Sequence, residues 1–213
     1  MDHPFSCLIA GPSKAGKTMF VKKLIDNKDY MIKQELFKIW WFYTENQPLY
    51  DTFSTNVEFV QGLPDNSMLM SCKGQPQLVI LDDLMQETKN NALLTRLFTR
   101  GCHHWNISVI QIVQNAFFEG LRTSRINSDY LVLFKNPADR SYVSVLARQL
   151  FPKNMKYFLQ AYEDATLEPH GYLFVDLTQY TPDQYRLKTD IFTATPTLYV
   201  PENYKYGICE TKN

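Results

Sequence analysis

The sequence has few cysteines and no long apolar run. Its 213 residues include four cysteines, which form neither a CxxC pair nor a ladder of regular spacings. The sequence therefore predicts reduced thiols in an intracellular protein. No stretch approaches the roughly 20 apolar residues that span a bilayer. The first residues also lack the basic region and apolar core of a signal peptide. We expect no secretion and no membrane partner.

Internal repeats and low-complexity tracts are absent as well. Hydrophobic residues make up 45% of the chain and charged residues 21%, which argues against a disordered chain, a collagen or a coiled coil. The length suits one domain with a small appendage. Such a chain buries roughly 70% of the surface that its unfolded form exposes.

The chain also has no net charge, because its 22 basic residues are balanced by 22 acidic ones. An average of zero can hide a patterned surface. Residues 95–160 carry nine basic and three acidic residues, a net of +6, whereas residues 41–94 carry a net of −5. A nucleic-acid partner is therefore not excluded.

Strand-like segments alternate with helix-like ones along most of the chain. Short apolar or aromatic runs predict strands at 5–10, 38–43, 57–60, 78–81, 107–113, 130–134 and 172–175. Apolar residues at helical spacing predict helices at 18–26 and 91–100, and a third that begins at Asn136-Pro137. This alternation is typical of βαβ units and of a mostly parallel sheet with helices on both faces.

The strongest motif follows the first predicted strand and fits G-x-x-x-x-G-K-[ST]. Its residues are Gly11, Pro12, Ser13, Lys14, Ala15, Gly16, Lys17 and Thr18. Glycines let the backbone turn so that its N–H groups face phosphate oxygens, and the following helix adds its positive N-terminus. The motif predicts an ATP-binding phosphate loop in which Lys17 reaches the β- and γ-phosphates and Thr18 ligates Mg²⁺. Lys14 either reaches phosphate or faces solvent.

A pair of acids follows the buried strand at 78–81. Because ligands bind at the carboxyl ends of parallel strands, Asp82 is the expected Mg²⁺ ligand, directly or through water. Asp83 is expected to orient or deprotonate an attacking water, and it also fits a helix N-cap. An acid pair after a strand is a weak motif alone. It gains weight from the phosphate loop, whose Lys17 lies 65 residues upstream of Asp82.

Polar and basic residues flank the next predicted strand. Gln114 follows its end, where it either senses the γ-phosphate or simply ends the strand. Before it, Arg96 and Arg100 share one helix face at i, i+4 spacing. They form either a solvated basic face or an arginine finger for the ATP of a neighbouring subunit.

These features predict an α/β fold. The expected fold is that of a P-loop NTPase of the additional-strand catalytic-acid type, with a mostly parallel central sheet and helices on both faces. We assign residues 1–192 to the ATPase domain and residues 193–213 to a C-terminal tail.

The chain resembles a known superfamily, the FtsK–HerA group of DNA-pumping ATPases. The resemblance begins with the phosphate loop near the N-terminus, the acid pair, the arginine and the strand-end glutamine. Later segments make it similar to genome-packaging ATPases of Polinton/Maverick elements, adintoviruses and virophages, relatives of the poxvirus packaging ATPase. It runs from Pro4 to about Phe192. The later segments are Phe98-Thr99-Arg100-Gly101, His103-His104, Val113-Gln114-Asn115, Phe134-Lys135-Asn136-Pro137, Asp139-Arg140, Leu146-Ala147-Arg148-Gln149, Gly171-Tyr172-Leu173, Thr181-Pro182-Asp183 and Arg186-Leu187.

The resemblance implies a motor that drives double-stranded DNA into a preformed viral capsid at its portal vertex. It implies a ring of identical subunits, a hexamer or a pentamer, with ATP at the subunit interfaces. It places the arginine finger at Arg100, with Arg96 as second choice, and the polar sensor at Gln114. The implied location is inside the host cell, in the nucleus or a cytoplasmic virus factory, with association with the virion left open.

Two residues depart from the pattern of these ATPases. Lys14 stands where small residues are usual. Asp83 stands where many relatives have a catalytic glutamate, and its shorter side chain puts the water-activating role in question. Among the cations of residues 95–160, Arg122 and Arg125 are the first candidates for DNA contact. Arg125 also fits an approach to a neighbouring nucleotide, and both fit an ordinary basic surface.

Two other functions fit parts of the sequence. A small nucleoside or nucleotide kinase has about this length and an N-terminal phosphate loop, but Gln114 and the helix-end arginines favour a ring ATPase. A nucleotide-binding capsid-assembly factor without turnover is the other alternative. The complete set of Lys17, Thr18, Asp82 and Asp83 argues against it.

Overall fold

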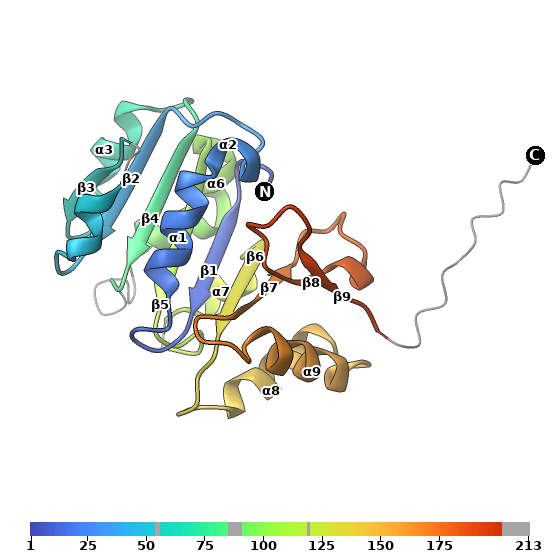
Figure 1. Ribbon diagram of the computed structural model, residues 1–213. Coiled ribbons are helices and arrows are strands. Elements are labelled where there is room, and N and C mark those ends of the chain that lie inside the picture. Colours follow the sequence, from blue (N-terminus) through green and yellow to red (C-terminus); the bar gives the residue numbers. More distant parts are fainter. Residues whose placement is uncertain (54–55, 85–90, 119, 202–213) are drawn as a thin grey trace, which may run out of the picture.

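The computed structural model of the chain describes residues 1–53, 56–84, 91–118 and 120–201, and for residues 100–103 it describes the backbone only. In this part, nine strands form one sheet in the order β3-β2-β4-β5-β1-β6-β7-β8-β9 (Figure 1). The strands are β1 Ser6–Ala10, β2 Lys38–Tyr43, β3 Glu58–Gln61, β4 Gln77–Asp82, β5 Ile107–Val113, β6 Tyr130–Phe134, β7 Tyr172–Asp176, β8 Leu187–Thr189 and β9 Thr197–Tyr199.

The sheet is mostly parallel. Every pairing from β3 across to β6 is parallel, and β7, β8 and β9 continue the sheet with antiparallel pairings. Strand β5 lies between β1, which precedes the phosphate loop, and β4, which precedes the acid pair. This extra strand between the two confirms the predicted α/β fold of the additional-strand type.

Helices cover both faces of the sheet (Figure 1). The side chains of β1 alternate between the faces: Cys7 and Ile9 pack with the apolar side of α1, and Leu8 and Ala10 pack with α8 and α9. The helices are α1 Lys17–Asp26, α2 Lys28–Met31, η1 Pro48–Thr52, α3 Asn66–Ser71, α5 Ala92–Arg96, η2 Leu97–Gly101, α6 Cys102–Trp105, α7 Arg122–Ile126, α8 Ser141–Leu150, α9 Met155–Ala165 and η3 Asp183–Tyr185.

The helix predicted to begin at Asn136-Pro137 begins later. Helix α8 starts at Ser141. The Asn136 Oδ1 atom accepts bonds from the backbone N–H groups of Ala138 and Asp139, and Asp139 Oδ1 accepts one from the N–H of Ser141. Two successive side-chain-capped turns therefore precede the helix, because Asn and Asp satisfy nearby N–H groups without helical backbone.

The helix predicted for residues 91–100 is present and longer. The Asn91 side chain caps it by accepting bonds from the N–H groups of Leu93 and Leu94. After α5 the backbone passes through the π-helical turn η2 and continues as α6 to Trp105. The backbone of Arg100 lies in this π turn.

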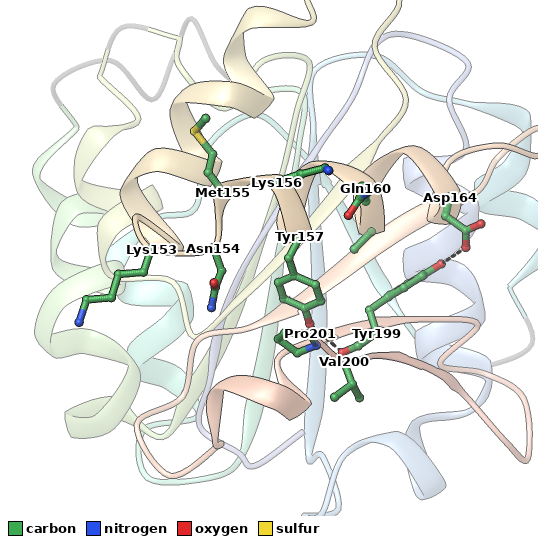
Figure 2. A pocket seen from close by; sticks show the side chains of 11 residues that line it. Lys153, Asn154, Met155, Lys156, Tyr157, Gln160, Asp164, Tyr199, Val200 and Pro201 are labelled. Atoms are coloured by element: carbon green, nitrogen blue, oxygen red, sulfur yellow. Dashed lines mark hydrogen bonds between the residues drawn. The ribbon is translucent and has the colours of Figure 1, made fainter. Parts of the chain in front are cut away.

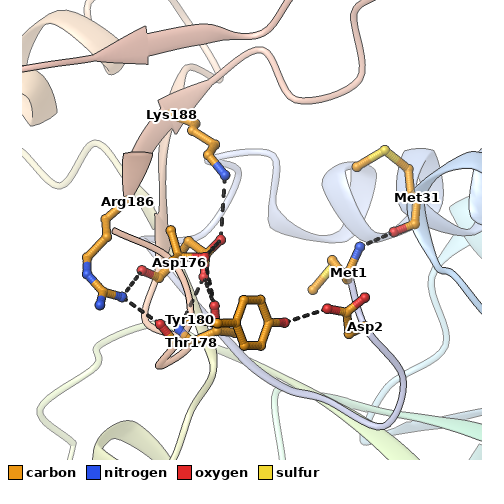
Figure 3. Close-up of polar contacts among 9 residues, drawn as sticks. Met1, Asp2, Met31, Asp176, Thr178, Tyr180, Arg186 and Lys188 are labelled. Carbon is orange, nitrogen blue, oxygen red and sulfur yellow. Dashed lines mark hydrogen bonds and ion pairs between the residues drawn. The ribbon is translucent and has the colours of Figure 1, made fainter. Parts of the chain in front are cut away.

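The antiparallel end of the sheet is tied to the start of the chain (Figure 3). The Asp176 carboxylate accepts hydrogen bonds from the N–H and hydroxyl of Thr178. Arg186 donates to the backbone carbonyls of both residues. The Tyr180 hydroxyl donates to Asp2 at 2.6 Å, which links this corner to the N-terminal segment.

Strand β9 lies within the stretch assigned to the tail and pairs with β8, whereas residues 202–213 lie outside the described part. The division of the chain at residue 192 stays a prediction. Among the described residues, no helix has the length and apolar character needed to cross a membrane.

Candidate nucleotide site

Three neighbouring strands end at the same level of the sheet, and each leads into a predicted site segment. In the register of the sheet, Ala10 of β1 lies beside Val113 of β5, and Asp82 of β4 lies beside Ile112. The N–H of Gly11 donates to the Val113 carbonyl at 3.2 Å. The fold therefore brings the phosphate loop, the acid pair and Gln114 to one edge.

The phosphate loop has the backbone that its glycines allow. Lys14 and Gly16 have φ angles of 65° and 107°, in the left-handed region. A Cβ atom on Gly11 would lie 2.6 Å from Phe134 Cβ, so only glycine fits that position. Helix α1 starts directly after Gly16, which makes no side-chain capping bond. The N–H groups of its first turn are therefore left to bind an anion.

The Lys17 ammonium group lies over this loop. It donates to the carbonyl oxygens of Gly11 at 2.7 Å and Pro12 at 2.8 Å. An ammonium has three N–H donors, so one remains for a phosphate oxygen. Burial lowers the Lys17 pKa, and the nearby charges of Asp83 and Asp82 oppose that shift. The lysine thus lies within electrostatic reach of both predicted acids.

The two acids occupy different environments. Asp82 is buried and accepts a hydrogen bond from the Tyr50 hydroxyl at 3.0 Å. Burial raises the Asp82 pKa to about 6, although the Tyr50 bond opposes the shift. Asp83 is exposed, with a φ angle of 55°, and its carbonyl accepts a bond from the Thr44 hydroxyl at 3.1 Å. Adjacent carboxylates in such different surroundings can take separate roles.

Gln114 contacts Asp83 directly. Its side-chain Nε2 donates to Asp83 Oδ2 at 3.1 Å and to Oδ1 at 3.4 Å. Both side chains are exposed, so the pair faces the edge of the sheet where the strands end. The alternative role of Asp83 as a helix N-cap concerns residues 85–90, which lie outside the described part.

The oxygen donors at this edge fit a magnesium ion. Mg²⁺ prefers oxygen ligands and is usually held by one or two protein groups together with phosphate oxygens. The Thr18 hydroxyl, in the first turn of α1, and the Asp82 carboxylate are donors of this kind. The described residues contain no cluster of three or more His, Cys, Asp and Glu side chains that would hold a metal alone.

A cavity of about 300 Å³ opens beside the phosphate loop. Its walls are mainly aromatic and aliphatic, and it begins at the loop itself. The lining residues are Gly16, Met19, Phe20, Lys23, Phe134, His170, Tyr172 and Phe192.

A larger cavity of about 760 Å³ lies between α9 and β9 (Figure 2). None of its lining residues belongs to the phosphate loop or the acid pair. The larger cavity is therefore distinct from the candidate site.

Two residues of the site were missed by sequence reasoning. Tyr50 bonds to Asp82, 32 positions away, and the ring Nδ1 of His170 lies 3.1 Å from the carbonyl of Ala15, 155 positions away. A Cβ on Gly16 would lie 3.2 Å from the same ring nitrogen. Neither residue belongs to a motif, and no pattern in the sequence points to these contacts.

The predicted arginines have different surroundings. The guanidinium of Arg96 lies 4.8 Å from the Trp105 ring centroid. That of Arg125 lies 3.8 Å from the Phe117 ring centroid and donates to the Ala116 carbonyl. Arg122 is exposed on α7. The side chain of Arg100 lies outside the described part, so its predicted role stays a prediction.

Comparison with known proteins identifies viral packaging enzymes among similar structures. No family model matches the chain, and no curated protein does either. The genome packaging NTPase B204 from Sulfolobus turreted icosahedral virus 2, in complex with AMP, is 13% identical and matches with a TM-score of 0.58 over 85% of this chain and 96% of that chain. The AMPPCP complex of B204 is 14% identical, with a TM-score of 0.57 over the same shares of the two chains.

The DNA-packaging ATPase B204 from Sulfolobus Turreted Icosahedral Virus is also similar. It is 12% identical, with a TM-score of 0.59 over 83% of this chain and 94% of that chain. At such identities the likeness shows the fold alone: an α/β architecture with a mostly parallel sheet that matches P-loop packaging ATPase structures.

Proposed function

We propose that the chain is an ATP-hydrolysing motor that translocates double-stranded DNA into a preformed viral capsid. The observation that carries this proposal is the meeting of the phosphate loop, the acid pair and Gln114 at adjacent ends of β1, β4 and β5. The fold shared with the B204 packaging ATPases supports it. We further propose membership of the FtsK–HerA superfamily, nearest to the Polinton, adintovirus and virophage enzymes, on the motifs described above.

In this proposal the phosphate loop and Lys17 hold the ATP phosphates. The first-turn N–H groups of α1 and the free N–H of Lys17 supply the donors. Thr18 and Asp82 would hold Mg²⁺, which would neutralise charge that develops on the phosphate oxygens. The buried carboxyl of Asp82 has a raised pKa and would have to give up its proton to ligate the metal.

Asp83 is the proposed acceptor for a proton of the attacking water. It is exposed and unlike Asp82 is free of the Tyr50 contact, which suits contact with water. Its side chain is one methylene shorter than a glutamate. The bonds from Gln114 fix its carboxylate, and a γ-phosphate at the same edge would reach the Gln114 amide. This pair would couple phosphate sensing to water activation.

The cavity beside the loop is the proposed site of the nucleotide base. It starts at Gly16 and offers the aromatic rings of Phe20, Tyr172 and Phe192. Flat aromatic walls suit a purine ring, which gains dispersion and stacking energy there. The cavity thus adjoins the phosphate site and would receive the apolar base of the nucleotide.

The ring and the DNA contacts belong to the same proposal. In a hexamer or pentamer, Arg100 would act on the ATP of a neighbouring subunit, with Arg96 as second choice. Arg122 is the better DNA candidate of its pair, because Arg125 already bonds to Ala116 and packs on Phe117. The capsid portal vertex remains the proposed partner of the assembled ring.

The fate of the γ-phosphate separates a motor from a nucleoside kinase. We expect the purified protein with Mg²⁺ and ATP to release inorganic phosphate when a mixture of nucleosides is present. Lys17→Ala is the control and should abolish nucleotide binding or turnover. Transfer of labelled phosphate to a nucleoside would favour the kinase and overturn the proposal.

A single-turnover measurement separates the motor from an assembly factor that binds nucleotide without hydrolysing it. Assembled protein in excess over labelled ATP should convert it to ADP. Stable binding without conversion, with DNA present and absent, would favour the assembly factor.

A further inference from the structure

The Tyr50 hydroxyl makes a buried contact with the proposed metal ligand. It donates to Asp82 Oδ2 at 3.0 Å, and Tyr50 and Asp82 are only 5% and 3% exposed. A phenol hydroxyl carries its proton at physiological pH, so it is a hydrogen-bond donor to Asp82. One oxygen of Asp82 is therefore held by a permanent donor.

The ring of Tyr50 is fixed by its surroundings. It stacks on Phe59, with centroids 4.8 Å apart and planes 22° apart, and its centroid lies 5.2 Å from that of Tyr43 and 5.5 Å from that of Trp41. The N–H of Tyr50 donates to the Gln47 carbonyl at 2.9 Å in the turn η1. A ring packed on three sides has little freedom to move its hydroxyl.

The indole of Trp41 reinforces this arrangement. Its Nε1 is buried and has no hydrogen-bond partner among the described residues. Its ring packs against those of Phe53 and Phe59, with centroids 5.3 Å and 5.8 Å away. The Tyr50 ring is thus part of one aromatic cluster built from β2, η1 and β3.

We propose that Tyr50 is a positioning residue for the metal–nucleotide site, whose hydroxyl fixes the Asp82 carboxylate in the orientation that receives Mg²⁺. This inference rests on the proposed ATPase function. A carboxylate has about four lone-pair sites, and the tyrosine occupies one of them. The others remain for the metal or its waters. Such outer partners change metal affinity by about 10- to 100-fold.

The chain offers a matched pair of variants. Tyr50→Phe removes the hydroxyl and keeps the ring in its stack. Tyr43→Phe removes a hydroxyl from the same aromatic cluster. It leaves the hydrogen bond to Asp82 in place, because that bond comes from Tyr50. A difference between the variants therefore reports the Asp82 contact and not the loss of a tyrosine hydroxyl in general.

The test is the affinity for a fluorescent non-hydrolysable ATP analogue, measured in EDTA and in Mg²⁺. For Tyr50→Phe we expect wild-type affinity in EDTA and a loss of about 10-fold in the tightening that Mg²⁺ gives. Tyr43→Phe should keep the full tightening. In an Asp82→Asn background, Tyr50→Phe should have no further effect, because the two residues act as one unit.

Three results would overturn the inference. The first is a Tyr50→Phe variant whose nucleotide affinity Mg²⁺ increases as much as in the wild type. The second is a Tyr43→Phe variant that loses as much of the Mg²⁺ effect as Tyr50→Phe does. The third is a weaker nucleotide affinity of Tyr50→Phe in EDTA, which would mean that the hydroxyl stabilises the fold and not the metal site. Failure of the ATPase proposal looks different, because the wild-type protein itself would then show no Mg²⁺-dependent binding or no phosphate release.

Discussion

Asp82 and Asp83 are adjacent in the chain, yet burial gives them different chemistry. Asp82 ends a strand that is buried along its whole length, and Asp83 turns out of the sheet with a left-handed backbone. Desolvation disfavours a buried charge, and burial raises the pKa of Asp82 to about 6. The buried Asp82 is therefore the proposed metal ligand, and the exposed Asp83 is the proposed acceptor of a proton from water.

The raised pKa of Asp82 predicts a cost in stability at neutral pH. The folded carboxyl holds its proton up to about pH 6, whereas the unfolded one loses it near pH 4. Stability from this group is therefore full below pH 4 and is lost as the pH rises to about 6. The asparagine of Asp82→Asn does not ionise, so this variant does not lose stability in this way. The free energy of unfolding of the variant minus that of the wild type should therefore increase by about 3 kcal/mol between pH 4 and pH 7.

Urea unfolding in EDTA at several pH values measures this difference, and a difference between the two proteins that is independent of pH would contradict the burial account.

Gly11 predicts a second effect at this scale. A Cβ on Gly11 would meet the Cβ of Phe134 at 2.6 Å, and Phe134 is buried on β6. Gly11→Ala should lower the free energy of unfolding by about 1–3 kcal/mol. Ser13→Ala, an exposed change in the same loop, is the control and should stay within about 0.5 kcal/mol. Equal urea midpoints for the two variants would argue against the close approach.

At the scale of elements, the long helix before β5 carries both candidate fingers. Arg96 lies on α5 with its guanidinium over Trp105, and the backbone of Arg100 lies in the π turn η2. Such turns interrupt the helical ladder and are frequent at functional sites.

This element predicts activity that is shared between subunits. Arg100→Ala should leave ATP binding largely intact and remove hydrolysis. Mixing it with the equally inactive Asp83→Asn should recover part of the activity, because one interface then combines an intact finger with an intact acid. Steady-state phosphate release measures the recovery. Its absence would argue for a different finger, and the same mixing with Arg96→Ala tests the second choice.

The sequence predicted the central elements well and their contacts less well. Buried parallel strands appear in the sequence as continuous apolar runs. Because the carboxyl ends of parallel strands lie at one edge of a sheet, the residues that follow them, Lys17, Asp82 and Gln114, could be predicted to lie near one another. The contact of Tyr50 with Asp82 depends on how the segment between β2 and β3 packs, which no local pattern encodes. The start of α8 was misplaced because the Asn136 cap serves a turn as well as a helix.

At the scale of the whole molecule, zero net charge conceals a division along the chain. Residues 41–94 hold the acid pair within a net charge of −5, and residues 95–160 hold the arginines within a net charge of +6. The sheet joins these regions, since β4 belongs to the first and its neighbour β5 to the second. One strand pair thus joins the region that holds the proposed metal ligand Asp82 to the region that holds the proposed DNA-contact residues.

The central claim is that ATP hydrolysis by this fold is coupled to duplex DNA. The most direct measurement is the rate of phosphate release from Mg²⁺-ATP with and without long duplex DNA, with Lys17→Ala as the inactive control. We expect duplex DNA to raise the rate several-fold and added salt to weaken this effect, because phosphate contacts release counterions. A rate that is the same with and without DNA, at low salt and with assembled protein, would contradict the account.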